Sequence, residues 1–201
     1  MKLSITGSRV PLTRLFGIGA LFLILFTSHS FAQEGPIDVV LEVSGLFLLT
    51  AASLGRLWAL MYIAGNKKRE VVRTGPYSIM RHPLYFFSFI GVVGIGLASE
   101  NLLVLAAVVL FYLSYYPFSV RAEEQKLIER FGQAYLDYKA TVPAVVPNLS
   151  LYRAPRQYDV NMAQWLRNIG DSMWFVGIFL FLHGIEALQN WGAIPVLLRF
   201  P

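Results

Sequence analysis

The chain has 201 residues, of which 56% are apolar and only 14% are charged, and its mean hydropathy is +0.54. The core of a soluble protein of this size does not require so many apolar residues, so we expect the bilayer to be its main solvent. Cysteine is absent, which excludes disulfides, thiolate metal sites and a cysteine nucleophile. The three histidines are scattered, and we predict no metal site.

The net charge of +5 raises the question of a nucleic-acid partner. The basic residues lie in short segments between apolar runs, where anionic lipid headgroups and membrane topology account for them. The sequence contains no basic stripe and no recognition motif, so we expect membrane lipids and no nucleic acid as partners.

Five apolar stretches follow one another, and several approach the roughly 20 residues that a helix needs to cross a bilayer. Because unpaired backbone groups are very costly in lipid, these stretches should be helices rather than open strands. The predicted fold class is all-α, a polytopic membrane protein with about five transmembrane helices. The stretches are Leu15 to Phe31, Val39 to Ala64, Leu84 to Ala98, Leu102 to Val120 and Met173 to Leu198.

Basic residues also predict the orientation in the membrane. Lys and Arg gather before the first stretch, between the second and third, and after the fourth, whereas the connections 29–38 and 99–101 contain neither. The positive-inside rule then places the N-terminus inside and the C-terminus outside. We expect an integral protein, in a bacterial inner membrane, whose functional site faces the cytoplasm.

The N-terminus allows two interpretations. A basic start, the apolar run Leu15 to Phe26 and the small residues Ser30 and Ala32 also fit a signal peptide cleaved before Gln33. Either outcome leaves Gln33 outside and the later topology unchanged.

Two features inside the apolar stretches need an explanation. Arg56 is an intramembrane charge that should face the bundle interior or reach the inner surface, and a functional role and an anchoring role both remain open. The string from Gly91 to Gly96 lacks the preceding strand that a nucleotide-binding loop requires. It therefore predicts close packing between helices.

The first polar segment with candidate chemistry runs from Arg69 to Tyr85. Pro83 suits a first helical turn, which places His82 near a helix N-terminus and Tyr85 on the same face. An imidazole, a phenol and free backbone N–H groups would then converge where a carboxylate can be held. Taken alone, His82 would more often be an interfacial histidine than a ligand.

The second polar segment, from Arg121 to Pro143, carries Glu123 and Glu124 on a helix that should leave the membrane and bend at Gly132. A tight turn at 99–101 makes this helix a neighbour of the one that follows His82. The two acids should therefore lie at the depth of the first segment. Separately, a pair of glutamates is more often a solvated face.

Together, these residues resemble the isoprenylcysteine carboxyl methyltransferase family and the related phospholipid methyltransferases. The resemblance covers roughly residues 54–147. It rests on Gly-Pro-Tyr77, Arg81-His-Pro-Leu-Tyr85, Glu123-Glu124, Phe131-Gly132, Tyr135, Tyr138 and Val142-Pro143.

The resemblance implies an S-adenosylmethionine-dependent methyltransferase whose cofactor lies in a cytoplasm-facing cavity, with an interfacial helix and no Rossmann sheet. Residues 33–150 would be the methyltransferase core, after a first transmembrane helix or signal peptide (1–32) and before a connector and last transmembrane helix (151–201). Arg121 and Glu124 are the candidate catalytic residues. The implied cofactor contacts are Arg69, Glu70, Val71, Val72, Tyr77, His82, Pro83, Leu84, Tyr85 and Glu123.

Three departures from the family pattern leave the methyl acceptor open. Ser119 replaces an arginine that holds the substrate carboxylate in carboxyl-methylating relatives, Phe87 replaces a usual glycine, and Ala144 replaces a common arginine. A carboxylate acceptor needs an orienting cation, whereas an amine such as phosphatidylethanolamine must lose a proton, for which Glu124 is the candidate. We favour a lipophilic carboxylate acceptor over phospholipid N-methylation, a nicotinamide-dependent membrane reductase or a non-catalytic membrane protein.

Overall fold

In the computed structural model, the described residues are 19, 25, 27–29, 35–65, 69–195 and 198–200. Four long helices dominate: α2 (Pro36–Ile63), α4 (Pro83–Ala98), α5 (Leu102–Phe131) and α7 (Met162–Asn190). Shorter elements are α3 (Pro76–Ile79), α6 (Gln133–Thr141) and the 3-10 helix η1 (Leu149–Leu151). Two three-residue strands, β1 (Thr27–His29) and β2 (Leu198–Phe200), pair in parallel. Apart from these two strands, the regular secondary structure of the described residues consists of helices.

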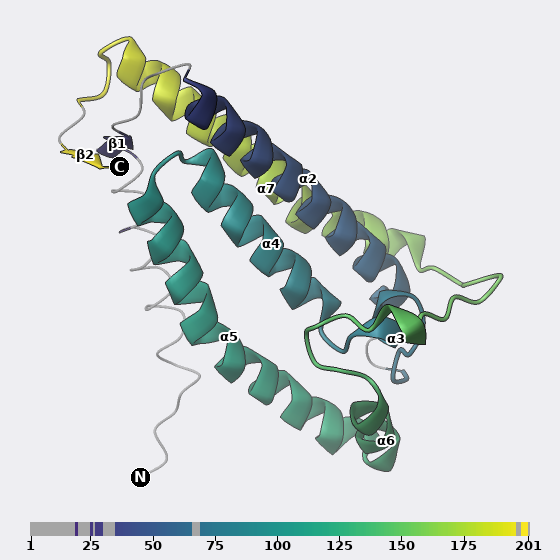
Figure 1. Cartoon of the computed structure of the whole chain (residues 1–201). Helices are drawn as coiled ribbons and strands as arrows, with labels where there is room; N and C mark the ends of the chain where they lie inside the picture. Colours follow the sequence, from purple (N-terminus) through teal and green to yellow (C-terminus); the bar gives the residue numbers. More distant parts are fainter. Residues whose placement is uncertain are drawn as a thin grey trace.

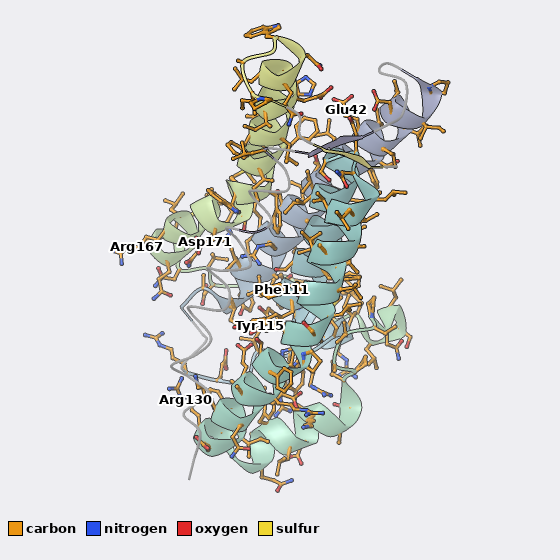
Figure 2. All side chains as sticks on the ribbon, turned by 90° about the vertical axis from the view of Figure 1, so that its left-hand side faces the viewer. Glu42, Phe111, Tyr115, Arg130, Arg167 and Asp171 are labelled. Carbon is orange, nitrogen blue, oxygen red and sulfur yellow. The ribbon has the colours of Figure 1, made fainter. Side chains whose placement is uncertain are left out.

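Helix α4 lies between α5 and the pair formed by α2 and α7 (Figure 1). Figure 2 shows the same bundle from the side, with Glu42 near one end and Arg130 near the other. Helices α2, α5 and α7 are long and apolar enough to cross a membrane, and α4, with 16 residues, is a shorter apolar helix.

Two of the predicted stretches differ from the structure. The first, Leu15 to Phe31, lies mostly outside the described residues, and its described end is strand β1 rather than helix. The last was predicted from Met173 to Leu198, but α7 begins at Met162 and ends at Asn190. Gly192, with a φ of +74°, follows this end in a conformation that a continuing helix does not allow.

Glycines on α4 and α2 bring the helices into close contact, as the sequence predicted for residues 91–96. A Cβ on Gly94 would lie 2.9 Å from the Leu49 side chain of α2, and one on Gly91 would lie 2.4 Å from the Phe175 ring of α7. These glycines therefore do not form a nucleotide loop. They allow the approach between helices that small residues provide in membrane bundles.

Phe87 also packs through a glycine. A Cβ on Gly55 would lie 2.1 Å from the Phe87 ring, so the ring occupies the space left beside α2 at this glycine. Trp58, one turn along α2, makes an edge-to-face contact with the same ring at a centroid distance of 6.4 Å. The departure from the family's glycine at residue 87 is thus matched by a glycine on the neighbouring helix.

Helix α5 begins and ends at well-defined caps. The Asn101 side chain accepts hydrogen bonds from the N–H groups of Leu103 and Val104 at 2.9 and 3.2 Å, which satisfies two free donors of the first turn. At the other end, Gly132 has a φ of +53°, and α6 starts at the next residue. The bend predicted at Gly132 is therefore present, and it turns α6 back toward α3.

Candidate active site

The carboxylate of Glu124 on α5 is surrounded by three basic side chains. Its Oε1 accepts a hydrogen bond from Nε of Arg81 at 3.0 Å, forms an ion pair with Nη2 of Arg81 at 2.9 Å and lies 3.2 Å from Nε2 of His82. Its Oε2 accepts a hydrogen bond from Nζ of Lys139 on α6 at 2.6 Å. Glu124 is only 7% exposed. Its charge-assisted contacts join α5, α6 and the start of α4.

Backbone hydrogen bonds reinforce this junction. The N–H groups of Arg81 and His82 donate to the carbonyls of Pro143 and Ala144 at 2.8 and 3.1 Å. The segment before α4 and the segment after α6 are thus paired directly. The two polar segments singled out in the sequence form a single structural unit.

His82 is the N-cap residue of α4, and Pro83 is the first residue of the helix. Its side chain is buried, and this burial lowers the pKa of His82 although the hydrogen bond with Glu124 acts in the opposite direction. A neutral imidazole that donates Nε2–H to Glu124 fits these contacts. The rings of His82 and Tyr85 are arranged edge to face, with 5.9 Å between their centroids.

Two adjoining cavities meet at Tyr77, His82 and Glu123. One has a volume of about 60 Å³, and the other, between α2 and α4, has a volume of about 230 Å³. Of the predicted cofactor contacts, the first is lined by Glu70, Val71, Val72, Tyr77, His82 and Glu123, and the second by Tyr77, His82, Pro83, Leu84, Tyr85 and Glu123. A ligand of cofactor size would have to extend from one cavity into the other, since small-molecule sites typically measure roughly 300–1,000 Å³.

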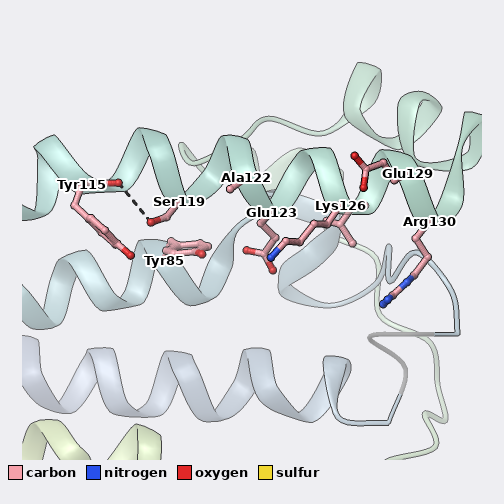
Figure 3. A pocket seen from close by; sticks show the side chains of 9 residues that line it. Tyr85, Tyr115, Ser119, Ala122, Glu123, Lys126, Glu129 and Arg130 are labelled. Atoms are coloured by element: carbon pink, nitrogen blue, oxygen red, sulfur yellow. Dashed lines mark hydrogen bonds between the residues drawn. The ribbon is translucent and has the colours of Figure 1, made fainter. Parts of the chain in front are cut away.

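A third pocket, of about 690 Å³, runs along α5 (Figure 3). Glu123 extends from α5 toward the helix that carries Tyr85, and Ser119 donates a weak hydrogen bond to the Tyr115 carbonyl at 3.4 Å. Charges of both signs line the pocket, from Glu123, Lys126, Glu129 and Arg130. Glu123 therefore lines all three spaces.

The structure does not bring Arg69 or Arg121 into these cavities. Both side chains are exposed, and neither lines a described pocket of the site. Arg121 precedes Glu123 by two residues, which rotates it by about 200° around a helix. An arginine at residue 121 therefore points away from the face that carries Glu123.

Sequence reasoning missed the partners of Glu124. Arg81 belongs to the quoted Arg-His-Pro motif, but the motif gave no role to its guanidinium. Lys139 gave no signal at all, because it reaches Glu124 only through the bend at Gly132. In the part of the chain that the structure describes, no group of three or more His, Asp and Glu residues is placed to hold a metal ion.

Residues 41–134 match the phospholipid methyltransferase family. The nickel-cobalt-cadmium resistance protein NccN of Alcaligenes xylosoxydans is 34% identical over 98% of this chain and 92% of its own length. The cobalt-zinc-cadmium resistance protein CzcN of Cupriavidus metallidurans is 33% identical over 94% of this chain and 87% of its own. The protein-S-isoprenylcysteine O-methyltransferase of Saccharomyces cerevisiae is 31% identical over 54% of this chain and 46% of its own.

No solved structure matches the chain. The family match includes the first polar segment and the second as far as Ala134. The yeast relative is named as an isoprenylcysteine methyltransferase, the family that the sequence motifs resemble. NccN and CzcN also align with the parts of the chain that lie outside residues 41–134. The chain therefore belongs to the same family as NccN and CzcN, and its residues 41–134 form a phospholipid methyltransferase family domain.

Proposed function

We propose that the protein transfers a methyl group from S-adenosylmethionine to a lipophilic acceptor, with a carboxylate as the favoured acceptor group. The observation that carries the proposal is the position of Glu123. It lies where the two cavities lined by the predicted cofactor contacts adjoin the larger pocket along α5. One residue thus connects a space for the cofactor with a space for the acceptor.

The residues around the two smaller cavities suit S-adenosylmethionine. The N-terminus of α4 beside His82 offers N–H donors for the methionine carboxylate, and Glu123 offers a carboxylate for its ammonium group. Tyr77 and Val71 supply apolar walls for an adenine ring. When bound, the cofactor supplies an electrophilic methyl group on a sulfonium, and the protein contributes alignment and electrostatics.

The contacts of Glu124 argue for a supporting role rather than proton transfer. Both of its oxygens accept charge-assisted hydrogen bonds, so taking a proton would weaken the junction between α5, α6 and α4. For a carboxylate acceptor no base is needed, since its oxygen forms the new bond to the methyl group as the bond from sulfur breaks.

A second candidate is N-methylation of a phospholipid amine such as phosphatidylethanolamine. The charges around the 690 Å³ pocket favour it, because Lys126 and Arg130 suit a phosphate while Glu123 and Glu129 suit an amine. In this case Glu123, rather than Glu124, is our candidate for accepting the amine proton.

Calorimetric titration of the detergent-purified protein with S-adenosylhomocysteine tests the cofactor without knowledge of the acceptor. We expect saturable binding to the wild type. The affinity of Glu123→Gln should be lower by about tenfold or more, because a charge-assisted contact disappears. The affinity of Asp159→Asn should not change, since this carboxylate is exposed in the connector before α7. Binding of a reduced nicotinamide instead would favour the reductase. A well-folded wild type that binds neither ligand would contradict both enzymatic functions.

We further propose that the site faces the cytoplasm of a bacterial inner membrane. The absence of cysteine makes single introduced cysteines clean probes of sidedness. Arg156→Cys should be protected from a membrane-impermeant maleimide in intact spheroplasts, and Trp191→Cys, beyond the end of α7, should be labelled. The reverse pattern would place the site on the outer face.

The relatives suggest a physiological setting. NccN and CzcN are both named for resistance to cobalt and cadmium. We propose that this chain contributes to such resistance through methylation of its acceptor. Deletion of the gene should then lower growth in cobalt or cadmium, and Glu123→Gln should behave like the deletion. Full resistance with a cofactor-binding-deficient variant would separate resistance from methylation.

A further inference from the structure

Arg56 lies in α2, within a helix apolar enough to span a membrane. Its Nη1 donates a hydrogen bond to the Ser88 hydroxyl at 2.6 Å, and Ser88 donates its own proton to the Leu84 carbonyl at 2.7 Å. The guanidinium carbon lies 5.9 Å from the centre of the Phe175 ring of α7. The side chain is therefore held at one place inside the bundle.

These contacts leave the cation incompletely compensated. The Nε atom of Arg56 is buried and has no hydrogen-bond partner in the described part of the chain. The group that accepts its hydrogen bond, the Ser88 hydroxyl, is neutral. Asp171 on α7 attracts the guanidinium only through space. A guanidinium remains charged in proteins and is costly within a bilayer, so this arrangement suits an anionic ligand.

A suitable space lies beside it. Arg56 lines the 230 Å³ cavity between α2 and α4 together with Tyr85, Ser88 and Glu123. This is one of the two cavities proposed above for the cofactor, and Glu123 connects it to the larger pocket. A carboxylate bound by Arg56 would share this cavity with one end of the cofactor, and the apolar part of the acceptor would lie in the larger pocket along α5.

We propose that Arg56 binds and orients the carboxylate of the methyl acceptor. The inference rests on the proposed function and deepens it, because it supplies the orienting cation that α5 lacks at Ser119. Arg56 would hold the acceptor carboxylate from α2, in the cavity that adjoins the pocket lined by Ser119. Its planar fork of donors can bind both oxygens of a carboxylate, which a lysine cannot do.

The test compares an acid with its uncharged ester. The probes are N-acetyl-S-farnesyl-L-cysteine and its methyl ester, which share the same apolar tail, and the full-length protein is held in nanodiscs of neutral lipid. We measure the affinity of each probe for the wild type, Arg56→Gln, Arg56→Lys and Arg156→Gln. Arg156 is an exposed arginine of the connector before α7 and serves as the matched control.

We expect the wild type and Arg156→Gln to prefer the acid by about tenfold, Arg56→Lys to keep part of this preference, and Arg56→Gln to lose it. Titration of the same samples with S-adenosylhomocysteine should give similar affinities for all four. Arg56→Lys keeps the charge, so it separates loss of binding from loss of folding.

Equal affinity of the wild type for acid and ester would overturn the proposal, as would a preference that survives in Arg56→Gln. A selective loss of S-adenosylhomocysteine binding in Arg56→Gln would assign the guanidinium to the cofactor carboxylate instead. If no variant binds S-adenosylhomocysteine but the acid preference depends on Arg56, the proposed function fails and the carboxylate site stands.

Discussion

The two ends of the helix bundle each bury a glutamate, but in opposite electrostatic surroundings. At the site end, Glu124 contacts Arg81, His82 and Lys139. At the other end, Glu100 precedes α5 and is only 6% exposed. Burial, together with the nearby carboxylates of Glu186, Asp38 and Glu42, raises the pKa of Glu100 to about 8.

The difference shows that burial alone does not determine what a carboxylate does in this fold. Surrounded by cations, Glu124 remains a charged acceptor and ties two polar segments together. With other carboxylates nearby, Glu100 has a pKa raised above neutrality and therefore holds a proton at neutral pH. His183, 3.6 Å from both Glu42 and Glu186, is the basic group of this second cluster in the described residues.

The largest effect should come from breaking the junction at the site end. Glu124→Gln leaves the partly buried Arg81 without its charge partner and should lower the free energy of unfolding by about 3 kcal/mol. Tryptophan fluorescence during heating in detergent measures the change as a lower Tm. Glu129→Gln, at an exposed residue of the same helix, is the control and should change Tm little. Equal Tm values for Glu124→Gln and the wild type would refute the structural role of Glu124.

A smaller loss should follow from filling the close contact between α2 and α4 near the other end. A Cβ on Gly45 would lie 2.6 Å from the backbone nitrogen of Ala98, which cannot move alone, so Gly45→Ala should cost about 1–3 kcal/mol. Gly177→Ala on α7, where an added Cβ meets nothing within 4 Å, is the matched control. The same heating experiment decides, and similar Tm values for the two variants would contradict the packing.

Removing a single hydrogen bond at the site end should have a modest effect. The Tyr138 hydroxyl donates to the Tyr77 carbonyl at 2.7 Å, between α6 and α3. Tyr138→Phe should therefore lower the free energy of unfolding by about 1 kcal/mol. The Tm of Tyr138→Phe is compared with that of Tyr152→Phe, which changes an exposed tyrosine. A Tyr138→Phe protein as stable as this control would show that the bond is not important.

The smallest effect should be a change in pH dependence at the other end. The pKa of Glu100 is about 8 in the folded protein and near 4.5 when exposed, so the folded state binds more protons and stability falls as pH rises between these values. Glu100→Gln should remove part of this fall. Its Tm advantage over the wild type should grow from pH 5 to about pH 8. Parallel Tm profiles over this range would contradict the raised pKa.

The apolar helices were predictable because length and hydropathy follow from composition. The bounds of α4 agree with the prediction within one residue at Pro83 and fully at Ala98. The start of α7 was not predictable from hydropathy, since residues 162–172 include Gln164, Arg167 and Asp171 and do not read as an apolar stretch.

At the site, the sequence predicted that His82 and the glutamate pair would approach each other, and the resemblance assigned Glu123 to the cofactor and Glu124 to catalysis. It did not predict that Arg81, His82 and Lys139 would all contact Glu124. Glu123 and Glu124 are adjacent and chemically identical, and a rotation of about 100° between them decides which one faces the cavities. The difference depends on Lys139, brought back by the bend after α5. Such contacts between distant residues leave no local pattern.

We propose that the two polar segments together hold S-adenosylmethionine. Ultraviolet cross-linking of radiolabelled S-adenosylmethionine to the full-length protein in membranes, followed by peptide mapping, identifies the residues that contact the cofactor. We expect saturable labelling in residues 69–85 or in the stretch of α5 around Glu123, prevented by excess S-adenosylhomocysteine. Labelling confined to α7, or labelling that S-adenosylhomocysteine does not prevent, would contradict it.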